Sequence, residues 1–377
     1  MTVYILVFAG ALVLAIGATP AARWLAPRVG VMDKPAARKI HHRPVPRMGG
    51  LAIYLAVIVA ALILGERYNF AQFGSILVGA TGVSFMGLID DRWGLRPLVK
   101  LLGQTLAALL LYISGIYVGT FHHPILNLVT TVLWVGYITN AVNFLDNMDG
   151  LAGGVSAIAA AFFALMCSFS GQYLVGALSI AVLGACLGFL FYNLNPANIF
   201  MGDSGSLFLG FTLAAIGIKL RFPDNVNFVT WMVPVLVMGL PIFDTTLVII
   251  SRLRRRLNPA TTPGKDHISH RLVAAGMTQR EAVLTLYVVS FILGLLATFV
   301  TRASVLEGYI VGGLVALAGL YGLWRVERPP FFGTEKTVGA RSPGQHAVGR
   351  MENGEWRMEK PEKPVGARSP GQRMGNG

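Results

Sequence analysis

Residues 140–154 read NAVNFLDNMDGLAGG, and they lie between two long apolar segments of the chain. The stretch carries two carboxylates three residues apart, Asp146 and Asp149, although only 18 of the 377 residues are acidic. Carboxylates beside a membrane helix are unfavourable unless they are paired, bind a metal or reach the water interface. We therefore interpret this stretch as part of a polar site at the end of membrane helices.

The composition of the chain is that of an integral membrane protein, with 54% hydrophobic residues, 13% charged residues and a mean hydropathy of +0.61. Eleven apolar segments approach or reach the ~20 residues that cross ~30 Å of hydrocarbon. They cover approximately residues 3–19, 48–64, 74–89, 98–113, 124–141, 151–168, 172–192, 205–218, 228–250, 282–300 and 304–324. We therefore predict an all-α integral membrane protein with about 11 transmembrane helices. Basic residues follow the first segment and none precedes it, so we expect a retained helix and not a cleaved signal peptide.

Lys and Arg residues are concentrated in alternate loops, which predicts the orientation of the chain in the membrane. Loops 20–47 and 251–280 hold seven each and loop 90–100 holds three, whereas the intervening loops together hold four. We expect the N-terminus outside, the C-terminus in the cytoplasm and the active site on the cytoplasmic face. The predicted cytoplasmic loops are 20–47, 90–97, 141–151, 192–205 and 251–281. The net charge of +13 follows this topology, so it does not indicate nucleic-acid binding.

The chain divides by composition into a membrane domain at 1–325 and a cytoplasmic tail at 326–377. The tail is rich in Gly, Pro, Arg and Glu and repeats VGARSPGQ at 338–345 and 365–372. Such a sequence cannot bury a core, so we expect it to be disordered. It is interpreted either as a solvated extension or as a weak contact for anionic lipid or protein.

Acidic residues gather at the cytoplasmic ends of the predicted helices. Five aspartates fall there: Asp90, Asp91, Asp146, Asp149 and Asp203. Asp90 and Asp91 end an apolar helix, and adjacent side chains on a helix point about 100° apart, so one can bind a metal while the other faces a nucleophile. Acids at a helix C-terminus oppose the helix dipole, which indicates a compensating cation. This one-sided clustering indicates a functional site.

Asp203 stands in the sequence FMGDSGS at 200–206, immediately before an apolar segment. Asp203 or Ser204 can cap the helix that follows, and we expect the N-terminus of that helix to attract phosphate through unpaired N–H groups. A hard cation such as Mg²⁺ takes oxygen ligands, usually one or two protein carboxylates with water and phosphate. The carboxylates on this face therefore predict a magnesium site.

Two basic loops supply groups that would meet phosphates. Residues 265–271 read KDHISHR, which places His267, His270 and Arg271 within one or two helical turns. The histidine spacing also suits zinc, but no cysteine or third histidine lies nearby, so anion binding is favoured. Residues 34–50 form the second basic loop, although topology alone explains part of its charge. Carboxylates, bases and a bilayer together indicate phosphoryl transfer that involves a lipid.

Six short motifs give the chain a resemblance to a known family. They are PRMGG at 46–50, DD at 90–91, NFLDNMDG at 143–150, FMGDSGS at 200–206, PIFD at 241–244 and DHISHR at 266–271. In this order they resemble the polyprenyl-phosphate N-acetylhexosamine-1-phosphate transferases, over about residues 30–325. The resemblance implies that undecaprenyl phosphate attacks the β-phosphorus of a UDP-N-acetylhexosamine, with Mg²⁺ or its substitute Mn²⁺, and releases UMP. It also implies a multi-pass protein of the bacterial plasma membrane that initiates lipopolysaccharide, teichoic acid or exopolysaccharide synthesis.

The resemblance implies roles for individual residues. Asp203 matches a Mg²⁺ ligand, and the pair at 90–91 matches residues that bind metal or act as base toward the lipid phosphate. The predicted catalytic residues are Asp90, Asp91, Lys100, Asp146, His267 and His270, and the predicted metal ligands are Asp90 and Asp203. The predicted substrate-binding residues are Lys39, Arg47, Asn143, Asn147, Asp149, Asn193 and Arg271. Which of Asp90 and Asp91 is base and which is ligand stays open.

The donor sugar is the least determined part of the prediction. The peptidoglycan branch of the family usually carries three consecutive histidines in the last loop, where this chain has HISHR at 267–271. This difference favours GlcNAc-1-phosphate, as do the eleventh segment and the long basic loop before the tenth. UDP-MurNAc-pentapeptide and UDP-GalNAc are the alternatives. Asn147 stands where a glycine is commoner, so its contacts with the nucleotide stay open.

Two other classes of function remain as alternatives. A secondary transporter would need carboxylates near mid-membrane and inverted repeats, and the sequence shows no such repeat. An inactive scaffold that works through the tail would not need the intact motifs. The expected partners are the polyprenyl phosphate, the UDP-sugar and the membrane, with a homodimer left open.

Overall fold

The computed structural model of the protein describes residues 2–33, 44–62, 70–259, 262, 264–328, 331, 349–352 and 355–358. It divides into two compact units, Met1–Gly333 and Thr334–Gly377. All the described helices belong to the first unit, and the second contains an antiparallel hairpin of β3 (Gly349–Glu352) and β4 (Glu355–Met358). Lys39, a predicted substrate-binding residue, lies outside the described residues.

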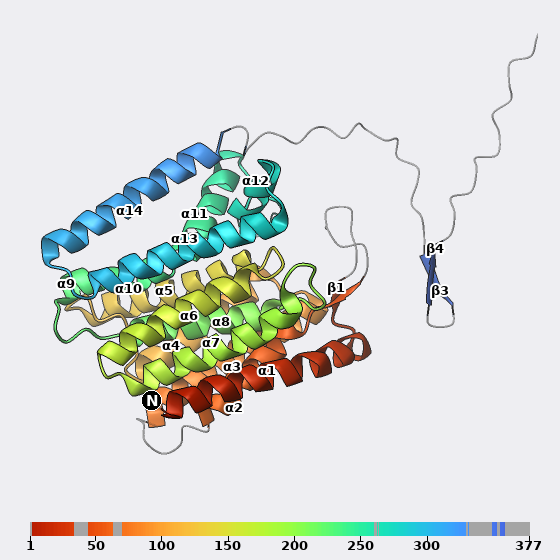
Figure 1. The fold of residues 1–377 in the computed structure, drawn as a ribbon, viewed down its shortest axis with the longest axis horizontal. Coiled ribbons are helices and arrows are strands. Elements are labelled where there is room, and N and C mark those ends of the chain that lie inside the picture. The colour runs from red at the N-terminus through yellow and green to blue at the C-terminus, as the bar shows by residue number, and fades with distance from the viewer. Residues whose placement is uncertain are drawn as a thin grey trace, which may run out of the picture. The chain divides into compact units, whose positions relative to one another are not determined.

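The first unit is a bundle of helices, as predicted (Figure 1). The helices are α1 (Thr2–Val29), α2 (Gly49–Leu62), α3 (Phe70–Trp93), α4 (Pro97–Ile113), α5 (Pro124–Leu145), α6 (Leu151–Phe169), α7 (Tyr173–Asn193), α8 (Asp203–Lys219), α9 (Asn227–Thr230), α10 (Met232–Val237), α11 (Gly239–Arg254), α12 (Ile268–Ala274), α13 (Gln279–Val300) and α14 (Val305–Val326). Two short strands, β1 (Met32–Asp33) and β2 (Val45–Pro46), pair antiparallel between α1 and α2. Each of the eleven predicted apolar segments falls on one of these helices or, for 228–250, on the run from α9 to α11.

Fewer of the described helices reach the length and hydropathy typical of a membrane crossing than the eleven segments predicted from the sequence. Among the described residues, seven helices are long and apolar enough to cross a membrane: α1, α3, α5, α6, α7, α13 and α14. The run from α9 to α11 bends by 72° between α10 and α11. It makes an eighth crossing only if the two parts are counted as one broken span. At 1.5 Å per residue, α2, α4 and α8 are shorter than the ~30 Å of hydrocarbon. The protein is thus a multi-pass membrane protein, whereas eleven crossings and the sidedness of the termini stay predictions.

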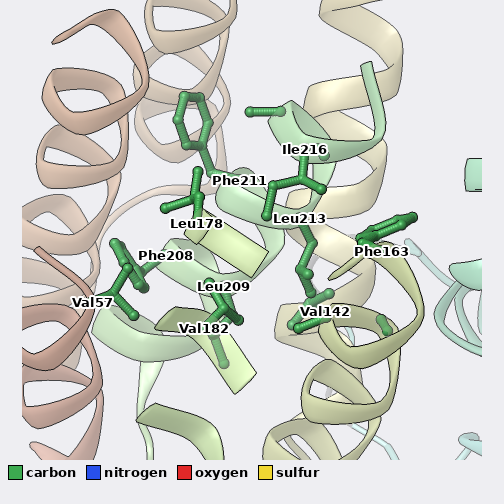
Figure 2. Close-up of a cluster of buried hydrophobic side chains, with 14 of the residues drawn as sticks. Val57, Val142, Phe163, Leu178, Val182, Phe208, Leu209, Phe211, Leu213 and Ile216 are labelled. Carbon is green, nitrogen blue, oxygen red and sulfur yellow. The ribbon is translucent and has the colours of Figure 1, made fainter. Parts of the chain in front are cut away.

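Helix α8 is the centre of the bundle. Every residue from Ser204 to Ile218 is buried, and α8 packs against α2, α3, α5, α6 and α7. Figure 2 shows its side chains Phe208, Phe211 and Leu213 among apolar residues of the neighbouring helices. By contrast, α14 buries only 6% of its most apolar stretch and lies at the edge of the bundle (Figure 1). A helix that is apolar on all sides belongs in a core, so the first residue of α8 is held firmly in place.

Glycines bring α2 and α3 against the first turn of α8. A Cβ atom on Gly50 would overlap the backbone of Gly205, and one on Gly87 would overlap the backbone of Asp203. Main-chain hydrogen bonds from Gly50 N to Met201 O (2.8 Å) and from Phe200 N to Pro46 O (2.8 Å) join the segments before α2 and α8. The motifs at 46–50, 90–91 and 200–206, which are far apart in the sequence, therefore meet at one place.

Candidate active site

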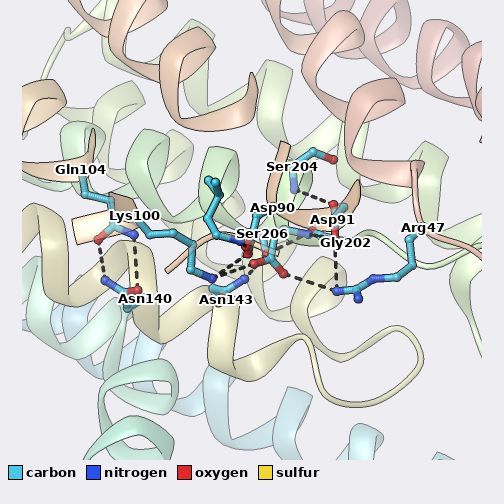
Figure 3. A network of polar contacts seen from close by, with 12 residues as sticks. Arg47, Asp90, Asp91, Lys100, Gln104, Asn140, Asn143, Gly202, Ser204 and Ser206 are labelled. Atoms are coloured by element: carbon cyan, nitrogen blue, oxygen red, sulfur yellow. Dashed lines mark hydrogen bonds and ion pairs between the residues drawn. The ribbon is translucent and has the colours of Figure 1, made fainter. Parts of the chain in front are cut away.

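The meeting point of these motifs is a group of charged side chains that we call the carboxylate cluster. It consists of Arg47, Asp90, Asp91, Lys100 and Asp203 (Figure 3). The last turn of α3 supplies the adjacent aspartates, the start of α4 supplies the lysine, and α8 begins at Asp203. All five residues were predicted from the sequence, and the structure brings them together.

Each cation of the cluster joins two carboxylates. Lys100 Nζ lies 2.8 Å from Asp90 Oδ2 and 3.0 Å from Asp203 Oδ2. Arg47 Nη2 lies 3.2 Å from Asp91 Oδ1 and 3.4 Å from Asp203 Oδ1. Asp33 of β1 lies 3.7 Å from Arg47 Nη1 and adds a further acid, which the sequence analysis missed. The compensating cation expected at the end of α3 is therefore present.

Asp91 caps α8 from another helix. Its carboxylate accepts hydrogen bonds from Asp203 N (3.1 Å) and Ser204 N (3.2 Å). The next two N–H groups, of Gly205 and Ser206, donate to Gly202 O. The expectation that unpaired N–H groups of this helix bind phosphate is therefore wrong, as is the expectation of a cap by Asp203 or Ser204. An acid from α3 satisfies the helix instead, and its side chain is fully buried.

Asp90 faces the other way from Asp91. Its Oδ1 accepts from Leu95 N at 2.5 Å, and its Oδ2 meets Lys100. The Asp90 side chain keeps 12% of its surface exposed, whereas Asp91 keeps none. The two adjacent acids thus have different surroundings, as the helical geometry predicted, and only Asp90 has a face open to an incoming ligand.

Asp90 and Asp203 have the donor chemistry for a divalent cation. Their carboxylates converge on one positive charge, the ammonium group of Lys100. Among the residues that the structure describes, no three His, Cys, Asp or Glu side chains form a metal-binding group. Mg²⁺ commonly binds through one or two carboxylates and completes its shell with water and substrate phosphates. The pair therefore fits Mg²⁺ or Mn²⁺, which prefer oxygen, better than zinc.

A chain of neutral polar side chains extends the carboxylate cluster toward α5 (Figure 3). Asn143 Nδ2 donates to Ser206 Oγ at 2.8 Å, and Asn140 Nδ2 donates to Gln104 Oε1 at 2.5 Å. Asn143 was a predicted residue, whereas Gln104 and Ser206 were missed as site residues. Gln104 lies one helical turn after Lys100 on α4, and that spacing was the signal in the sequence.

The loop after α5 contains Asp146 and Asp149, the two acids of residues 140–154. The half-buried carboxyl of Asp146 loses hydration, which raises its pKa to about 7 despite the nearby positive charge of Arg47. Asp149 accepts from Asn195 Nδ2 (2.9 Å) and Ala197 N (3.0 Å), so its carboxylate holds the loop before α8.

Asn193 also connects these loops. Its Oδ1 accepts from Gly150 N at 3.1 Å, and its Nδ2 donates to Ile199 O at 2.9 Å. Both Asp149 and Asn193 were predicted to bind substrate. In this structure their hydrogen bonds instead fix the positions of two loops that line the site.

Histidine 267 is oriented by an acid that the sequence analysis did not include among the site residues. His267 Nδ1 lies 2.8 Å from Asp244 Oδ2, and Ile268 N donates to Asp244 Oδ1 at 2.7 Å. Asp244 is fully buried on α11, so its carboxylate favours the tautomer with a proton on Nδ1 and leaves Nε2 for other partners. The signal for Asp244 in the sequence was the PIFD motif at 241–244, which places this acid within an apolar segment.

His270 lies beside His267, with 6.2 Å between the ring centroids. Burial, followed by the electrostatic effect of the neighbouring His267 and Lys265, lowers the pKa of His270 to about 4. The ring is therefore neutral at pH 7. A neutral His270 can donate or accept a hydrogen bond, but it adds no positive charge for an anion.

Arg271 differs from its predicted role. Its guanidinium donates to Asp266 O (2.8 Å), Val326 O (2.8 Å) and Ser251 Oγ (2.9 Å), and it lies 2.7 Å from Glu327. Only 2% of the side chain is exposed. Arg271 therefore holds α12 against α11 and α14. Its guanidinium makes structural contacts and does not face a substrate.

Residues 140–154 connect the carboxylate cluster with the histidines. Asn143 contacts the first turn of α8, the ring of Phe144 lies edge-on to His267 at 6.1 Å, and Asn147 Oδ1 accepts from Ser269 Oγ at 2.5 Å. The least typical residue of the stretch, Asn147, therefore has a partner within HISHR. Residues 143–147 form a wall with the carboxylate cluster on one side and the histidines on the other.

Known proteins share this chain's sequence over most of its length. The model of glycosyl transferase family 4 matches residues 73–221. The chain is 38% identical over 296 residues to a probable undecaprenyl-phosphate N-acetylglucosaminyl 1-phosphate transferase of Bacillus subtilis, which covers 76% of this chain and 82% of that protein. It is 36% identical over 307 residues to a decaprenyl-phosphate N-acetylglucosaminephosphotransferase of Mycobacterium tuberculosis (72% and 76%). It is 31% identical over 280 residues to a phospho-N-acetylmuramoyl-pentapeptide-transferase of Caldicellulosiruptor bescii (69% and 84%).

Proposed function

The chain belongs to glycosyl transferase family 4, and we propose that it transfers GlcNAc-1-phosphate from UDP-GlcNAc to undecaprenyl phosphate in a bacterial plasma membrane. The observation that carries this proposal is the carboxylate cluster, in which three carboxylates and two cations meet at the end of membrane helices. Such a group suits a reaction between two anions, one of which is a lipid.

Charge neutralisation is the main task of the site. A phosphate monoester has its second pKa near ~6, so the lipid phosphate is largely a dianion at neutral pH and needs no strong base. Lys100 and Arg47 reduce its repulsion from the diphosphate of the donor. Asp90 and Asp203 would hold Mg²⁺, which supplies further positive charge to the phosphate oxygens when bound.

The reaction is a substitution at phosphorus. An oxygen of the lipid phosphate forms a bond to the β-phosphorus of the UDP-sugar, and the bond from that phosphorus to the bridging oxygen breaks. UMP leaves with the electron pair of that bond, and the products balance as polyprenyl-diphosphoryl-sugar and UMP. Within the cluster, the exposed face of Asp90 suits contact with the metal or the lipid phosphate, and Asp91 holds the first turn of α8 for it.

The wall formed by residues 143–147 is the proposed donor side. Asn143, Asp146 and Asn147 belong to this wall, and His267 lies beside it against Phe144. The neutral His270 would donate a hydrogen bond to the sugar or to a phosphate oxygen, and His267 Nε2 would accept one from a sugar hydroxyl. Proteins at 38% and 36% identity are named for N-acetylglucosamine and one at 31% for N-acetylmuramoyl-pentapeptide, which supports GlcNAc over the alternatives.

The test is a donor panel with purified protein in detergent. UDP-GlcNAc, UDP-GalNAc and UDP-MurNAc-pentapeptide are each supplied with undecaprenyl phosphate and Mg²⁺, and UMP is measured. We expect UDP-GlcNAc to release UMP faster than the other donors, and we expect no UMP when the lipid or the metal is withheld. UMP from another donor alone would change the sugar assignment. If no donor gives UMP and the protein reconstituted in vesicles carries substrate across the bilayer, a transporter is favoured instead.

A further inference from the structure

A cavity of about 680 Å³ lies in the first unit away from the carboxylate cluster. The connection between α4 and α5, the end of α8 and the helices α9 and α10 enclose it. Its wall includes Tyr117, Phe121, Trp134, Arg221, Phe222 and Trp231. This volume is in the range of ligand-binding cavities, about 300–1,000 Å³.

The cavity and the carboxylate cluster occupy opposite ends of α8. The helix begins at Asp203, and its last turn contributes Gly217 and Ile218 to the cavity. Seventeen residues of α-helix span about 25 Å, so the length of this helix separates the two sites. Figure 1 shows α9 and α10 at one end of the bundle and α12 at the other. A nucleotide sugar bound at the carboxylate cluster therefore cannot reach this cavity.

The lining combines an apolar surface with one positive charge. Among the described residues that line it, Arg221 is the only charged one. Arg221 Nη1 donates to Ile218 O (2.6 Å) and Leu220 O (2.9 Å), which anchors the guanidinium at the end of α8. Phe228 and Trp231 at the rim are 65% and 46% exposed. Aromatic side chains of this kind are typical of the membrane–water interface.

We propose that this cavity binds an anionic phospholipid of the surrounding membrane. The acyl chain lies among the aromatic and aliphatic side chains, and the phosphate lies against Arg221. Arginine is the preferred partner of phosphate, and no carboxylate among the described lining residues opposes a negative charge. The exposed rim gives access from the bilayer. This site is separate from the proposed transferase reaction, and its existence does not depend on that reaction.

The experiment is native mass spectrometry of the purified protein titrated with phosphatidylglycerol or phosphatidylcholine. We expect tighter binding of phosphatidylglycerol, and we expect Arg221→Gln to weaken it by about tenfold while phosphatidylcholine changes little. The control is Arg302→Gln, since Arg302 also lies at this end of the bundle, beside Phe169, but outside the cavity. Equal loss in both variants, or no lipid preference in the wild type, would overturn the proposal.

A second variant tests the cavity without removing the charge. Thr130 lines the cavity and is half-buried, so Thr130→Trp fills space where the acyl chain would lie. We expect it to weaken both lipids by about tenfold or more, because several buried methylene groups lose their contacts. Unchanged binding in Thr130→Trp would also overturn the proposal. Asp203→Asn, which alters the carboxylate cluster at the other end of α8, should bind phosphatidylglycerol as the wild type does.

Discussion

The carboxylate cluster and the contacts around the histidines both pair acids with cations, but they differ in access to water. In the carboxylate cluster Asp91 is fully buried, but the side chains of Arg47, Lys100 and Asp203 are 34%, 20% and 16% exposed. Around the histidines, Arg271 is 2% exposed and Asp244 is fully buried. Exposed ion pairs contribute little stability and exchange partners readily, whereas breaking a buried pair is strongly destabilising. The first group is therefore suited to binding ligands, and the second to holding the framework that surrounds them.

The largest expected effect is on activity, in the accessible group. Asp203→Asn removes one of the two carboxylates proposed to hold Mg²⁺, and we expect UMP release to fall by about a thousandfold. The temperature of unfolding in detergent should change little, since the side chain is partly exposed. Asp224→Asn, in an exposed loop, is the control and should keep full activity. Activity in Asp203→Asn within tenfold of the wild type would remove Asp203 from the site.

The next effect is on stability, in the buried group. Arg271→Leu leaves Glu327 and Ser251 without their buried partner, and we expect the free energy of unfolding to fall by about 3–5 kcal/mol. The matched control is Arg254→Leu, because Arg254 pairs with the same Glu327 at 3.5 Å but is 67% exposed. Its removal should change stability by less than ~1 kcal/mol. Thermal unfolding of both variants measures the difference, and equal losses would contradict the comparison.

A smaller effect tests the connection between the two groups. Asp244→Asn removes the carboxylate that orients His267, and we expect kcat for UMP release to fall by about 10- to 100-fold with little change in KM. Asp244→Glu restores a carboxylate and should recover part of the rate, which a merely structural role would not explain. A KM effect alone in Asp244→Asn would indicate that His267 serves binding.

The pH dependence of stability tests the surroundings of His270. Its pKa is lowered to about 4, so the folded state favours the neutral ring. This contribution to stability is present above the unfolded pKa near 6.5 and is lost as the pH falls toward 4. The free energy of unfolding therefore falls between pH 7.5 and pH 5. Because the ring is partly exposed, we expect His270→Gln to make this fall smaller by about 1 kcal/mol. Unfolding temperatures measured at pH 7.5 and pH 5 should therefore converge in the variant, and parallel shifts would exclude this origin.

The smallest effect concerns the wall between the groups. Asn147→Gly introduces the residue that is commoner in the family and removes the hydrogen bond to Ser269, and we expect KM for the donor to rise by about two- to fivefold. Ser269→Ala removes the same bond but keeps the Asn147 amide, so we expect it to raise KM by less. Equal effects would show that Asn147 acts only through Ser269.

The sequence predicted the parts of the molecule that depend on local pattern. Apolar segments located the helices, and the clustering of aspartates at one end located the site. The unfavourable placement of acids at a helix C-terminus predicted a compensating cation, and the structure identifies Lys100 as the cation beside Asp90.

What the sequence could not predict depends on contacts between distant segments. Asp91 and Asp90 are adjacent in the chain, yet only the packing of α3 against α8 decides that Asp91 is buried and caps a helix. Arg271 reads as a substrate ligand by its type, and its role changes because α11 and α14 supply acceptors for it. The bend before Gly239 likewise turns one predicted span into several helices, and Pro241, which has no N–H to donate to Val237 O, lies in the first turn after it.

The cap that Asp91 provides for α8 has a consequence for how the protein is made. The carboxylate and the N–H of Asp203 that it accepts are 112 residues apart in the chain, on helices that leave the ribosome at different times. A nascent chain that ends before α8 already carries Asp90, Asp91 and Lys100, but it has neither Asp203 nor the helix that Asp91 closes. The carboxylate cluster is therefore completed only after α8 has been made and has packed against α3.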